Sequence, residues 1–452
     1  MTLPPSLPIP RLVQSLAWTR FPVQFLHHCH KKYGPTFRVK LPPYDMVMLT
    51  DPESIRTIFA SKGDDMQAGR VNRVLRAVVG GHSVLLLDGA EHMRHRKLLL
   101  PSFHGERMRL YGQTMAEITR QSIARWPTDT PLILHNQTQD ITLQIILRTV
   151  FGIDEGPQLQ VLRDQLTQFL KLGEHPLWLP LMVLLSLDPS REQRLPWKLF
   201  LSARDRTDVL LYQQISNRRR ESAKERSDVL AMLLQAVDEQ GQGLTDEELR
   251  DELMTALVAG HETTATALAW AFERILLHPS IYAKLQQEVR DAGGISASPE
   301  KLASLPYLDA TIKEVLRLRP VIPFVGRVLA QPLSIAGYDL PAGTAVSACI
   351  YLAHRNPSVY PDPEAFRPDR FLQGQPDPAS WLPFGGGIRR CIGASFALYE
   401  MKIVMGTILA HTELSLASPR AATIQRRAIT FWPKGGVPLR LQSRQMTSAS
   451  PI

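Results

Sequence analysis

Cys391 lies in a loop whose residue types favour a reactive or metal-binding thiol. The loop holds three consecutive glycines, Gly385 to Gly387, which allow a tight backbone turn, and Arg389 and Arg390 directly precede the cysteine. A helical pattern begins after Gly393, so the helix dipole and the two cations favour a thiolate. A thiolate that faces loop amides is a good axial ligand for a haem iron. A nucleophilic cysteine, an inert buried thiol and a phosphate-binding loop are alternatives, although the Lys-Ser/Thr pair that a phosphate loop needs is missing.

A second group of polar residues lies in the middle of a long apolar helix. Thr245 and Glu248 form a capping box at its start, and the helical pattern then continues to Leu277. Four residues at the centre interrupt the apolar pattern: Gly260, Glu262, Thr263 and Thr264. A buried acid is costly unless it is paired, and a glycine allows a ligand to approach the backbone. The pattern predicts a polar notch that faces a cofactor or substrate; a solvated face or an ordinary helix kink is the alternative.

The elements that must position these residues change in type along the chain. Short strand-like runs at Thr36–Lys40 and Met46–Thr50 precede a mostly helical region from Pro52 to about residue 294. Strands and turns follow residue 320. Length alone suggests three domains at roughly 150 residues each, but no flexible linker divides the 452 residues. We therefore expect one large, mainly helical α+β domain.

Composition excludes several classes of protein. Three widely spaced cysteines, Cys29, Cys349 and Cys391, cannot form a disulfide scaffold, which indicates a reducing, cytoplasmic environment. Prolines interrupt the N-terminus where a signal peptide would be apolar, and no run reaches the roughly 20 apolar residues that span a bilayer. The densest apolar run, Leu177–Leu187, predicts a buried helix, with a lid or a surface that contacts lipid as the alternative. The consecutive residues from His27 to His30 cannot all face one metal ion on a helix.

The net charge of +9 indicates an acidic partner. No acidic residue follows Glu413, whereas six basic residues do: Arg420, Arg426, Arg427, Lys434, Arg440 and Arg444. They are scattered and lack interleaved aromatic residues, so we expect no nucleic-acid binding. A basic face can instead attract an acidic protein.

Four motifs together resemble the cytochrome P450 superfamily, most closely its soluble bacterial and cyanobacterial members. The first is the haem-binding signature Phe384-x-x-Gly387-x-Arg389-x-Cys391-x-Gly393. The others are the oxygen-activating motif 259–264 (AGHETT), the Glu314-x-x-Arg317 helix and the arginine segment 366–371 (FRPDRF). A lone motif of this kind is weak, but their order and spacing together are specific. The resemblance covers about Pro35 to Gly436 and implies a mainly helical fold with small sheets: a segment 1–34, one domain 35–440 and a disordered tail 441–452.

The resemblance assigns roles residue by residue. It implies haem b with Cys391 as the proximal iron ligand, and Phe384 and Gly393 beside it in the loop. His92, Arg96, Arg327 and Arg389 match the cations that hold the haem propionates. Gly260 lies where the central helix passes the haem, and Glu262 with Thr263 matches the acid–alcohol pair that delivers protons during oxygen activation. Glu314, Arg317 and Arg370 match a structural ion-pair triad. Cys349 is expected to be a buried structural thiol.

The implied function is monooxygenation of an apolar small molecule with O₂. The chain has no room for a reductase domain, so electrons are expected from a ferredoxin and its reductase, or from a flavodoxin, docking near Arg390, Arg94 and Lys97. Residues Arg70–Leu86 and Val321–Val325 should line the pocket, with Leu177–Leu187 as its lid. Fatty acids, alkanes and terpenoids are the expected substrates, and a monomer is expected. A haem-thiolate isomerase, dehydratase or peroxygenase, and a non-catalytic haem sensor, are the alternatives.

Overall fold

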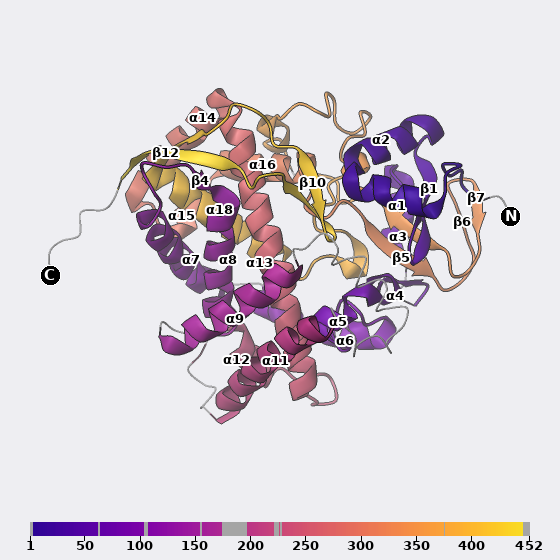
Figure 1. The fold of residues 1–452 in the computed structure, drawn as a ribbon, viewed down its shortest axis with the longest axis horizontal. Coiled ribbons are helices and arrows are strands. Elements are labelled where there is room, and N and C mark those ends of the chain that lie inside the picture. The colour runs from indigo at the N-terminus through magenta and orange to yellow at the C-terminus, as the bar shows by residue number, and fades with distance from the viewer. Residues whose placement is uncertain are drawn as a thin grey trace.

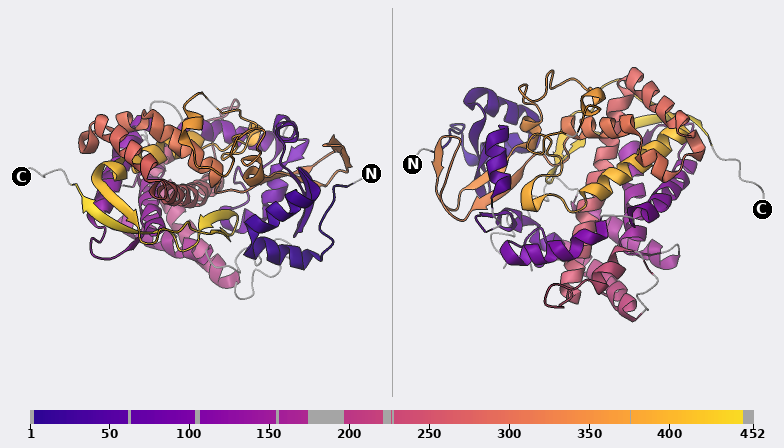
Figure 2. Two further views of the ribbon diagram at one scale, coloured as in Figure 1. Left: turned by 90° about the horizontal axis from the view of Figure 1, so that it is seen from above. Right: turned by 180° about the vertical axis from the view of Figure 1, so that it is seen from behind.

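The computed structural model describes residues 3–61, 64–103, 107–153, 156–173, 197–220, 226, 228–374 and 376–445. Within them, a large helical part is crossed by the long helix α13 (Asp246–Leu276), and a smaller strand-rich part holds the N-terminal residues (Figures 1 and 2). Among these residues, no helix combines the length and apolar character that crossing a bilayer requires. The predicted lid, Leu177–Leu187, lies outside the described residues.

Helix α13 begins as its sequence predicts. The Thr245 side chain accepts from the Glu248 backbone N–H, and the Glu248 carboxylate accepts from the Thr245 N–H, which satisfies two free amides of the first turn. At about 1.5 Å per residue, its 31 residues reach roughly 46 Å, enough to cross the helical part. Residues 264–273 of this helix are all buried, around Trp270 and Phe272, so apolar burial on all sides fixes its position.

Helices surround α13 on several sides. It packs most extensively against α8 (Leu134–Thr149) and also contacts α11 (Trp197–Arg220), α16 (Pro306–Leu318) and α18 (Ala394–His411). In the described part of the chain, the remaining helices of eight or more residues are α1 (Arg11–Arg20), α2 (Pro22–Tyr33), α3 (Pro52–Ala60), α6 (Gly89–Leu99), α7 (Arg107–Ala124), α9 (Pro157–Gly173) and α14 (Pro279–Asp291). The shorter ones are α4 (Ala68–Asn72), α5 (Arg76–Val79), α12 (Val229–Gln235), α15 (Pro299–Ala303) and α17 (Ile350–Ala353).

The strands form small sheets, as expected for a mainly helical fold. The largest has the order β1-β2-β8-β5-β3, and a three-stranded sheet has the order β4-β12-β9. Strands β6 with β7 and β10 with β11 form two hairpins. Their bounds are β1 Thr36–Leu41, β2 Tyr44–Leu49, β3 Met66–Gln67, β4 Leu132–Ile133, β5 Val325–Leu329, β6 Leu333–Ile335, β7 Tyr338–Leu340, β8 Ala345–Ala348, β9 Thr412–Leu416, β10 Ile424–Arg427, β11 Thr430–Pro433 and β12 Pro438–Arg444.

The two ends of the chain differ from the sequence-based expectation. Residues before 35 form helices α1 and α2, and their side chains Trp18, Phe25 and Leu26 are buried in one apolar cluster with β1 and β2. This segment is therefore part of the core beside the largest sheet. At the other end, β12 reaches Arg444 and pairs with β9, so residues 441–444 of the expected tail form a strand.

Candidate active site

The glycines of the Cys391 loop are required by close packing as well as by backbone shape. Gly385 and Gly387 both have φ of +64°, a region that favours glycine. A Cβ on Gly386 would lie 2.3 Å from the Phe59 ring, and one on Gly387 would lie 2.2 Å from the Phe59 carbonyl oxygen. Helix α3, which carries Phe59, therefore fixes the loop from one side. The Cys391 N–H donates to the Phe384 carbonyl at 3.0 Å, and α18 begins three residues later.

The prediction that arginine neighbours favour a thiolate at Cys391 holds for Arg390 but not for Arg389. Cys391 is exposed, yet desolvation by the surrounding protein atoms raises its pKa, and the Gly393 N–H, Arg96 and Arg390 lower the pKa without outweighing desolvation. Arg389 does not face the sulfur, because its guanidinium donates to the Val84 carbonyl at 3.1 Å and to Asp88 at 2.5 Å. The free thiol is therefore protonated, and a metal must displace its proton on binding.

A buried cluster of cations flanks this loop. His92, Arg96 and Arg327 lie close enough to Arg389 or to one another for their charges to interact. Burial lowers the pKa of His92 to about 3, with Arg389, Arg96 and Arg327 acting in the same direction. Burial also lowers the pKa values of Arg327 and Arg389 to about 10. These lowered pKa values show that nearby anions do not offset the free-energy cost of burying the three positive charges.

The cluster fits a dianionic group. Arg327 and Arg389 interact with one carboxylate, Asp88, and Arg96 forms no ion pair within the described residues, which leaves a surplus of about two positive charges. The buried His92 Nδ1 and Arg389 Nε find no hydrogen-bond partner in the described part of the chain. Arg96 donates to the Arg390 carbonyl at 2.8 Å, which ties the cluster to the cysteine loop. A haem, with two propionates and an iron that binds thiolate, matches this donor set.

The middle turn of α13 has an open face. Ala259 is exposed and Gly260 and Thr263 are half-buried, although Leu257 and Leu268 on either side are fully buried. The Thr263 hydroxyl donates to the Ala259 carbonyl at 2.6 Å, which is the backward hydrogen bond expected from the sequence. The predicted polar notch is thus present as an accessible turn in a buried helix.

Gly260 also lies against a neighbouring helix. A Cβ at this position would lie 3.1 Å from the Ile146 side chain of α8. The missing side chain therefore allows α8 and α13 to pack closely at the open turn, where Gly260 itself is half-buried.

Glu262 points away from this face, towards α8 and β10. Its carboxylate accepts from Gln139 Nε2 at 2.7 Å, and His135 Nε2 and Arg427 Nη1 lie 3.5 and 3.6 Å away. Burial raises its pKa, but the hydrogen bond and charge of His135, with His261 and Gln139, outweigh burial and lower the pKa to about 2. Glu262 is therefore ionised at neutral pH, so it can pass a proton only after accepting one from a donor.

The Glu314–Arg317–Arg370 triad forms as the motifs predict. Arg317 Nε and Nη2 donate to the two Glu314 carboxylate oxygens at 2.7 and 2.9 Å, and neither residue is exposed. Arg370 Nε donates to Glu314 at 3.1 Å. Arg317 also donates to carbonyls of residues 354, 363 and 365, so it anchors the irregular segment before the cysteine loop.

His354 is a connecting residue that sequence reasoning missed. Its Nδ1 donates to the Arg317 carbonyl at 3.0 Å, and its Nε2 accepts from the Leu382 N–H at 2.7 Å. Burial and the charge of Arg317 lower its pKa to about 3, so the ring is neutral and can accept. It links the triad to the start of the cysteine loop. Asp88 and Gln139 were also missed, and of these only Asp88 has a local signal, because it directly precedes helix α6.

His95 connects α6 to α13 through ion pairs. Helix α6 is the helix that carries His92 and Arg96. Its Nδ1 and Nε2 face Glu252 and Glu248 at 2.8 and 3.2 Å, and Arg94 also bonds to Glu248. Burial lowers the pKa of His95, but the two carboxylates outweigh burial and raise it. Only the imidazolium can donate from both nitrogens.

We expect His95→Gln to lower the unfolding free energy by about 1–3 kcal/mol near pH 6. A raised folded-state pKa gives stability that is fully present below the unfolded-state pKa of about 6.5 and is lost as pH rises through the folded value. The difference between wild type and variant should therefore be smaller at a second, alkaline pH. Denaturant unfolding at the two pH values measures it, and a difference that does not change with pH would contradict the assignment.

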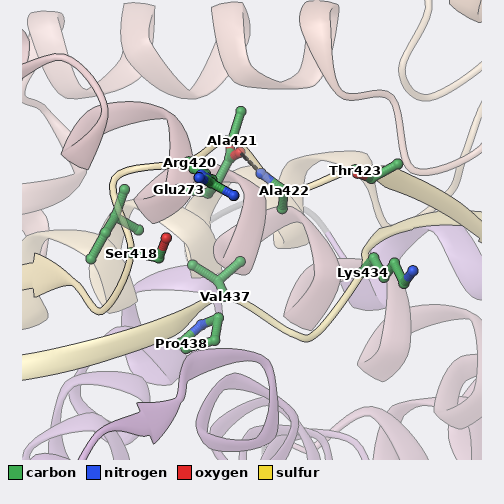
Figure 3. Close-up of a pocket in the computed structure, with 10 residues that line it drawn as sticks. Glu273, Ser418, Arg420, Ala421, Ala422, Thr423, Lys434, Val437 and Pro438 are labelled. Atoms are coloured by element: carbon green, nitrogen blue, oxygen red, sulfur yellow. Dashed lines mark hydrogen bonds between the residues drawn. The ribbon is translucent and has the colours of Figure 1, made fainter.

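A separate open pocket lies on another part of the molecule (Figure 3). It has a volume of about 230 Å³ between the β9–β10 connection and the β11–β12 turn, and Arg420, Lys434 and Glu273 are among its lining residues. None of the predicted haem or oxygen-activating residues lines it. Arg420 and Lys434 are exposed. The Glu273 carboxylate accepts hydrogen bonds from Arg274 and from the Ala422 N–H.

A thiol on a glycine loop, a buried cation cluster and an open turn of a central helix together define a haem-thiolate site. The family model described as Cytochrome P450 matches residues 3–435. The chain therefore belongs to the cytochrome P450 family, whose general reaction is monooxygenation, and haem with its iron is its cofactor.

Relatives and a solved structure agree with this assignment. The chain is 38% identical to cytochrome P450 135B1 of Mycobacterium tuberculosis over 100% of this chain and 93% of that protein. It is 39% identical to cytochrome P450 135A1 of the same species over 97% and 95% of the two chains. A structure titled "Retinoic acid bound cyanobacterial CYP120A1" matches with a TM-score of 0.85 and 26% identity, covering 98% of this chain and 100% of the other.

Proposed function

We propose that this chain hydroxylates an apolar small molecule, a fatty acid, an alkane or a terpenoid, with O₂ and two electrons from a separate ferredoxin-type protein. The observation that supports this most directly is the open turn of α13 with Thr263 accessible, in a chain that also has the cysteine loop and the cation cluster. When bound, haem supplies the oxygen-activating chemistry.

In this proposal each site residue has one task. Cys391 ligates the iron, and Phe384, whose carbonyl receives the Cys391 N–H, and Gly393, whose N–H faces the sulfur, shape the loop around it. His92, Arg96, Arg327 and Arg389 neutralise the two propionates. Gly260 allows α8 to hold α13 in place.

Thr263 and Glu262 are proposed to move protons. The Thr263 hydroxyl lies on the open face of α13 and can present a proton or a water there. The Glu262 carboxylate, one fifth exposed and bonded to Gln139, can take a proton from the His135 side and return it through water. This division explains why the acid and the alcohol point in different directions.

We expect the Thr263→Ala variant to retain haem but to use its electrons to form hydrogen peroxide in place of product. Oxygen uptake should continue while product per NAD(P)H falls at least tenfold and hydrogen peroxide rises, because a positioned proton-transfer group contributes roughly 10²–10⁴-fold. Thr263→Ser, which keeps the hydroxyl, should restore much of the yield. Product and peroxide are measured together in a reconstituted ferredoxin system, and tight coupling in the alanine variant would contradict the role.

The main alternative reactions need no electron supply from a protein partner. An isomerase, a dehydratase or a peroxygenase would turn over without NAD(P)H, and a sensor would not turn over at all. The intact Glu262–Thr263 pair argues for the reductive reaction. Product formation that requires NAD(P)H, ferredoxin and reductase together would support the proposal, and activity without them would contradict it.

Fewer unpaired basic residues are available to bind the electron donor than the sequence predicts. Arg94 bonds to Asp238 at 2.6 Å and to Glu248 at 3.1 Å, and Lys97 bonds to Glu239 at 2.7 Å. Arg390 is exposed beside the cysteine and forms no ion pair with the described residues. It remains the best candidate contact for an acidic ferredoxin.

We expect Arg390→Glu to slow reduction by ferredoxin about 3- to 10-fold at low ionic strength, because a charge at the rim of an interface mainly changes the association rate. The effect should become smaller in high salt, where the charges are screened. Lys97→Gln, which removes a cation already paired, is the matched control and should change the rate little. Stopped-flow reduction rates that do not respond to salt would contradict electrostatic docking.

The substrate class can be tested without turnover. Fatty acids, alkanes and terpenoids, including retinoic acid because it is bound in the CYP120A1 structure, should be screened for a shift in haem spin state. A saturable shift with one class supports it, and subsequent product analysis identifies the oxidised carbon.

A further inference from the structure

The open pocket between the β9–β10 connection and the β11–β12 turn has walls that hydrogen bonds hold in place (Figure 3). The Lys434 N–H donates to the Thr423 carbonyl at 2.9 Å, which joins the β11–β12 turn to the residue before β10. The Ala422 N–H donates to the carboxylate of Glu273, near the end of α13, at 2.8 Å. Segments from three parts of the chain are therefore tied together around the pocket, which makes it a preformed site.

Basic residues outnumber acidic ones around this pocket. Arg420 and Lys434 line it, are exposed, and form no ion pair with any described residue. Glu273 is the one acidic residue among the lining residues, and its carboxylate is already bonded to Arg274 at 2.6 Å. Burial lowers the pKa of the adjacent Arg319 to about 10, and Arg274 acts in the same direction, while Glu273 raises it. Four cations thus lie at or next to the pocket with one carboxylate, and this surplus of positive charge attracts an anion.

The pocket also has an apolar side and a limited size. Leu416, Val437 and Pro438 line it, and in Figure 3 Val437 and Pro438 lie opposite Arg420 and Glu273. Its volume of about 230 Å³ equals that of roughly seven or eight water molecules at about 30 Å³ each. Pockets for drug-sized ligands are larger, at about 300–1,000 Å³. The occupant should therefore be a small molecule with one apolar side and one anionic group.

We propose that this pocket binds a small organic monocarboxylate, whose carboxylate pairs with Arg420 and whose apolar body packs on Val437 and Pro438. A guanidinium can bind a carboxylate through two parallel hydrogen bonds, which favours this group over a spherical anion. The apolar side favours an organic acid over inorganic phosphate, because it gains from the burial of apolar surface. The inference does not depend on the proposed reaction, because none of the predicted haem or oxygen-activating residues lines the pocket.

The test is calorimetric titration of the full-length holoprotein with benzoate and with benzyl alcohol, which has the same ring and no charge. The haem iron is first saturated with 4-phenylimidazole, so that neither probe binds in the haem site, and the haem absorbance reports the saturation. We expect saturable binding of benzoate and at least tenfold weaker binding of benzyl alcohol, because the alcohol lacks the charge-assisted hydrogen bonds to Arg420. High salt should weaken the binding of benzoate, since the cations are exposed.

Two variants separate this pocket from the rest of the basic surface. Arg420→Gln removes the proposed partner of the carboxylate and should weaken the binding of benzoate at least tenfold. Arg440→Gln is the matched control, because Arg440 is exposed on β12 and does not line the pocket, and it should bind benzoate like wild type. Both variants should keep the wild-type unfolding midpoint, which shows that they fold. Equal binding of the two probes, equal binding by the two variants, binding of inorganic phosphate as tight as that of benzoate, or no binding in the 4-phenylimidazole-saturated protein would overturn the proposal.

Discussion

Cys391→Ser is expected to abolish the thiolate-type reduced carbon-monoxide spectrum and substrate turnover together. A serine hydroxyl is a close substitute in size, and the loop hydrogen bond from the residue 391 N–H to the Phe384 carbonyl is retained. The hydroxyl, however, cannot supply the anionic sulfur that donates electron density to the iron. The loss should exceed the roughly 10–100-fold that removal of an outer partner of a metal ligand costs.

The other two cysteines provide the controls for this experiment. Burial raises the pKa of Cys29 to about 11 and that of Cys349 to about 12, so both are neutral thiols, and both lie in the same apolar cluster. Cys29→Ala and Cys349→Ala should keep the spectrum and lose at most a small packing contribution. A thiolate-type spectrum in Cys391→Ser, or its loss in either control variant, would contradict the assignment of the iron ligand.

Arg317→Ala is expected to have the largest effect on folding and haem retention. The substitution leaves the Glu314 carboxylate fully buried with Arg370 as its remaining ion-pair partner among the described residues, and removes donors to three carbonyls of the segment 354–365. Breaking a buried ion pair from one side costs about 3–5 kcal/mol. We expect a matching fall in unfolding free energy, with a low haem content on purification.

Arg367→Ala is the matched control, because it removes a neighbouring arginine whose side chain is 57% exposed and pairs with the exposed Asp362 at 3.3 Å. An exposed pair of this kind contributes under about 1 kcal/mol. The Arg367 backbone N–H, which donates to Glu314, is kept in this variant. Similar losses in the two variants would show that Arg317 has no special structural role. Unfolding in denaturant and the haem-to-protein absorbance ratio measure both effects.

Local features of the fold followed from the sequence because their causes are local. The capping box at Thr245 and Glu248 lies within four residues, and the backward hydrogen bond of Thr263 spans one turn. Glu314 and Arg317 share a helix face by spacing alone. The mainly helical class and the first two strands were predicted for the same reason, since periodicity reports on each element by itself.

Features that depend on distant contacts were missed or were wrong. Helices α1 and α2 were not predicted, and their positions depend on packing against the largest sheet. Arg389 and Asp88 are 301 residues apart, and neither position identifies the other in the sequence. Only the crossing of α8 and α13 places Gly260 against Ile146, and no pattern in the sequence indicated that contact.

The sequence by itself determined which residues could do chemistry: one cysteine in a glycine loop, an acid and an alcohol in a buried helix, and a set of arginines. The tertiary structure decided their ionisation and direction. It places enough protein atoms around the Cys391 thiol to raise its pKa by desolvation, and it surrounds Glu262 with His135 and Gln139 so that its carboxyl stays ionised. It also gathers His92, Arg327 and Arg389 into one cluster short of anions. The physical reason is that charge states depend on burial and on neighbours, and both are set by segments that meet only when the chain folds.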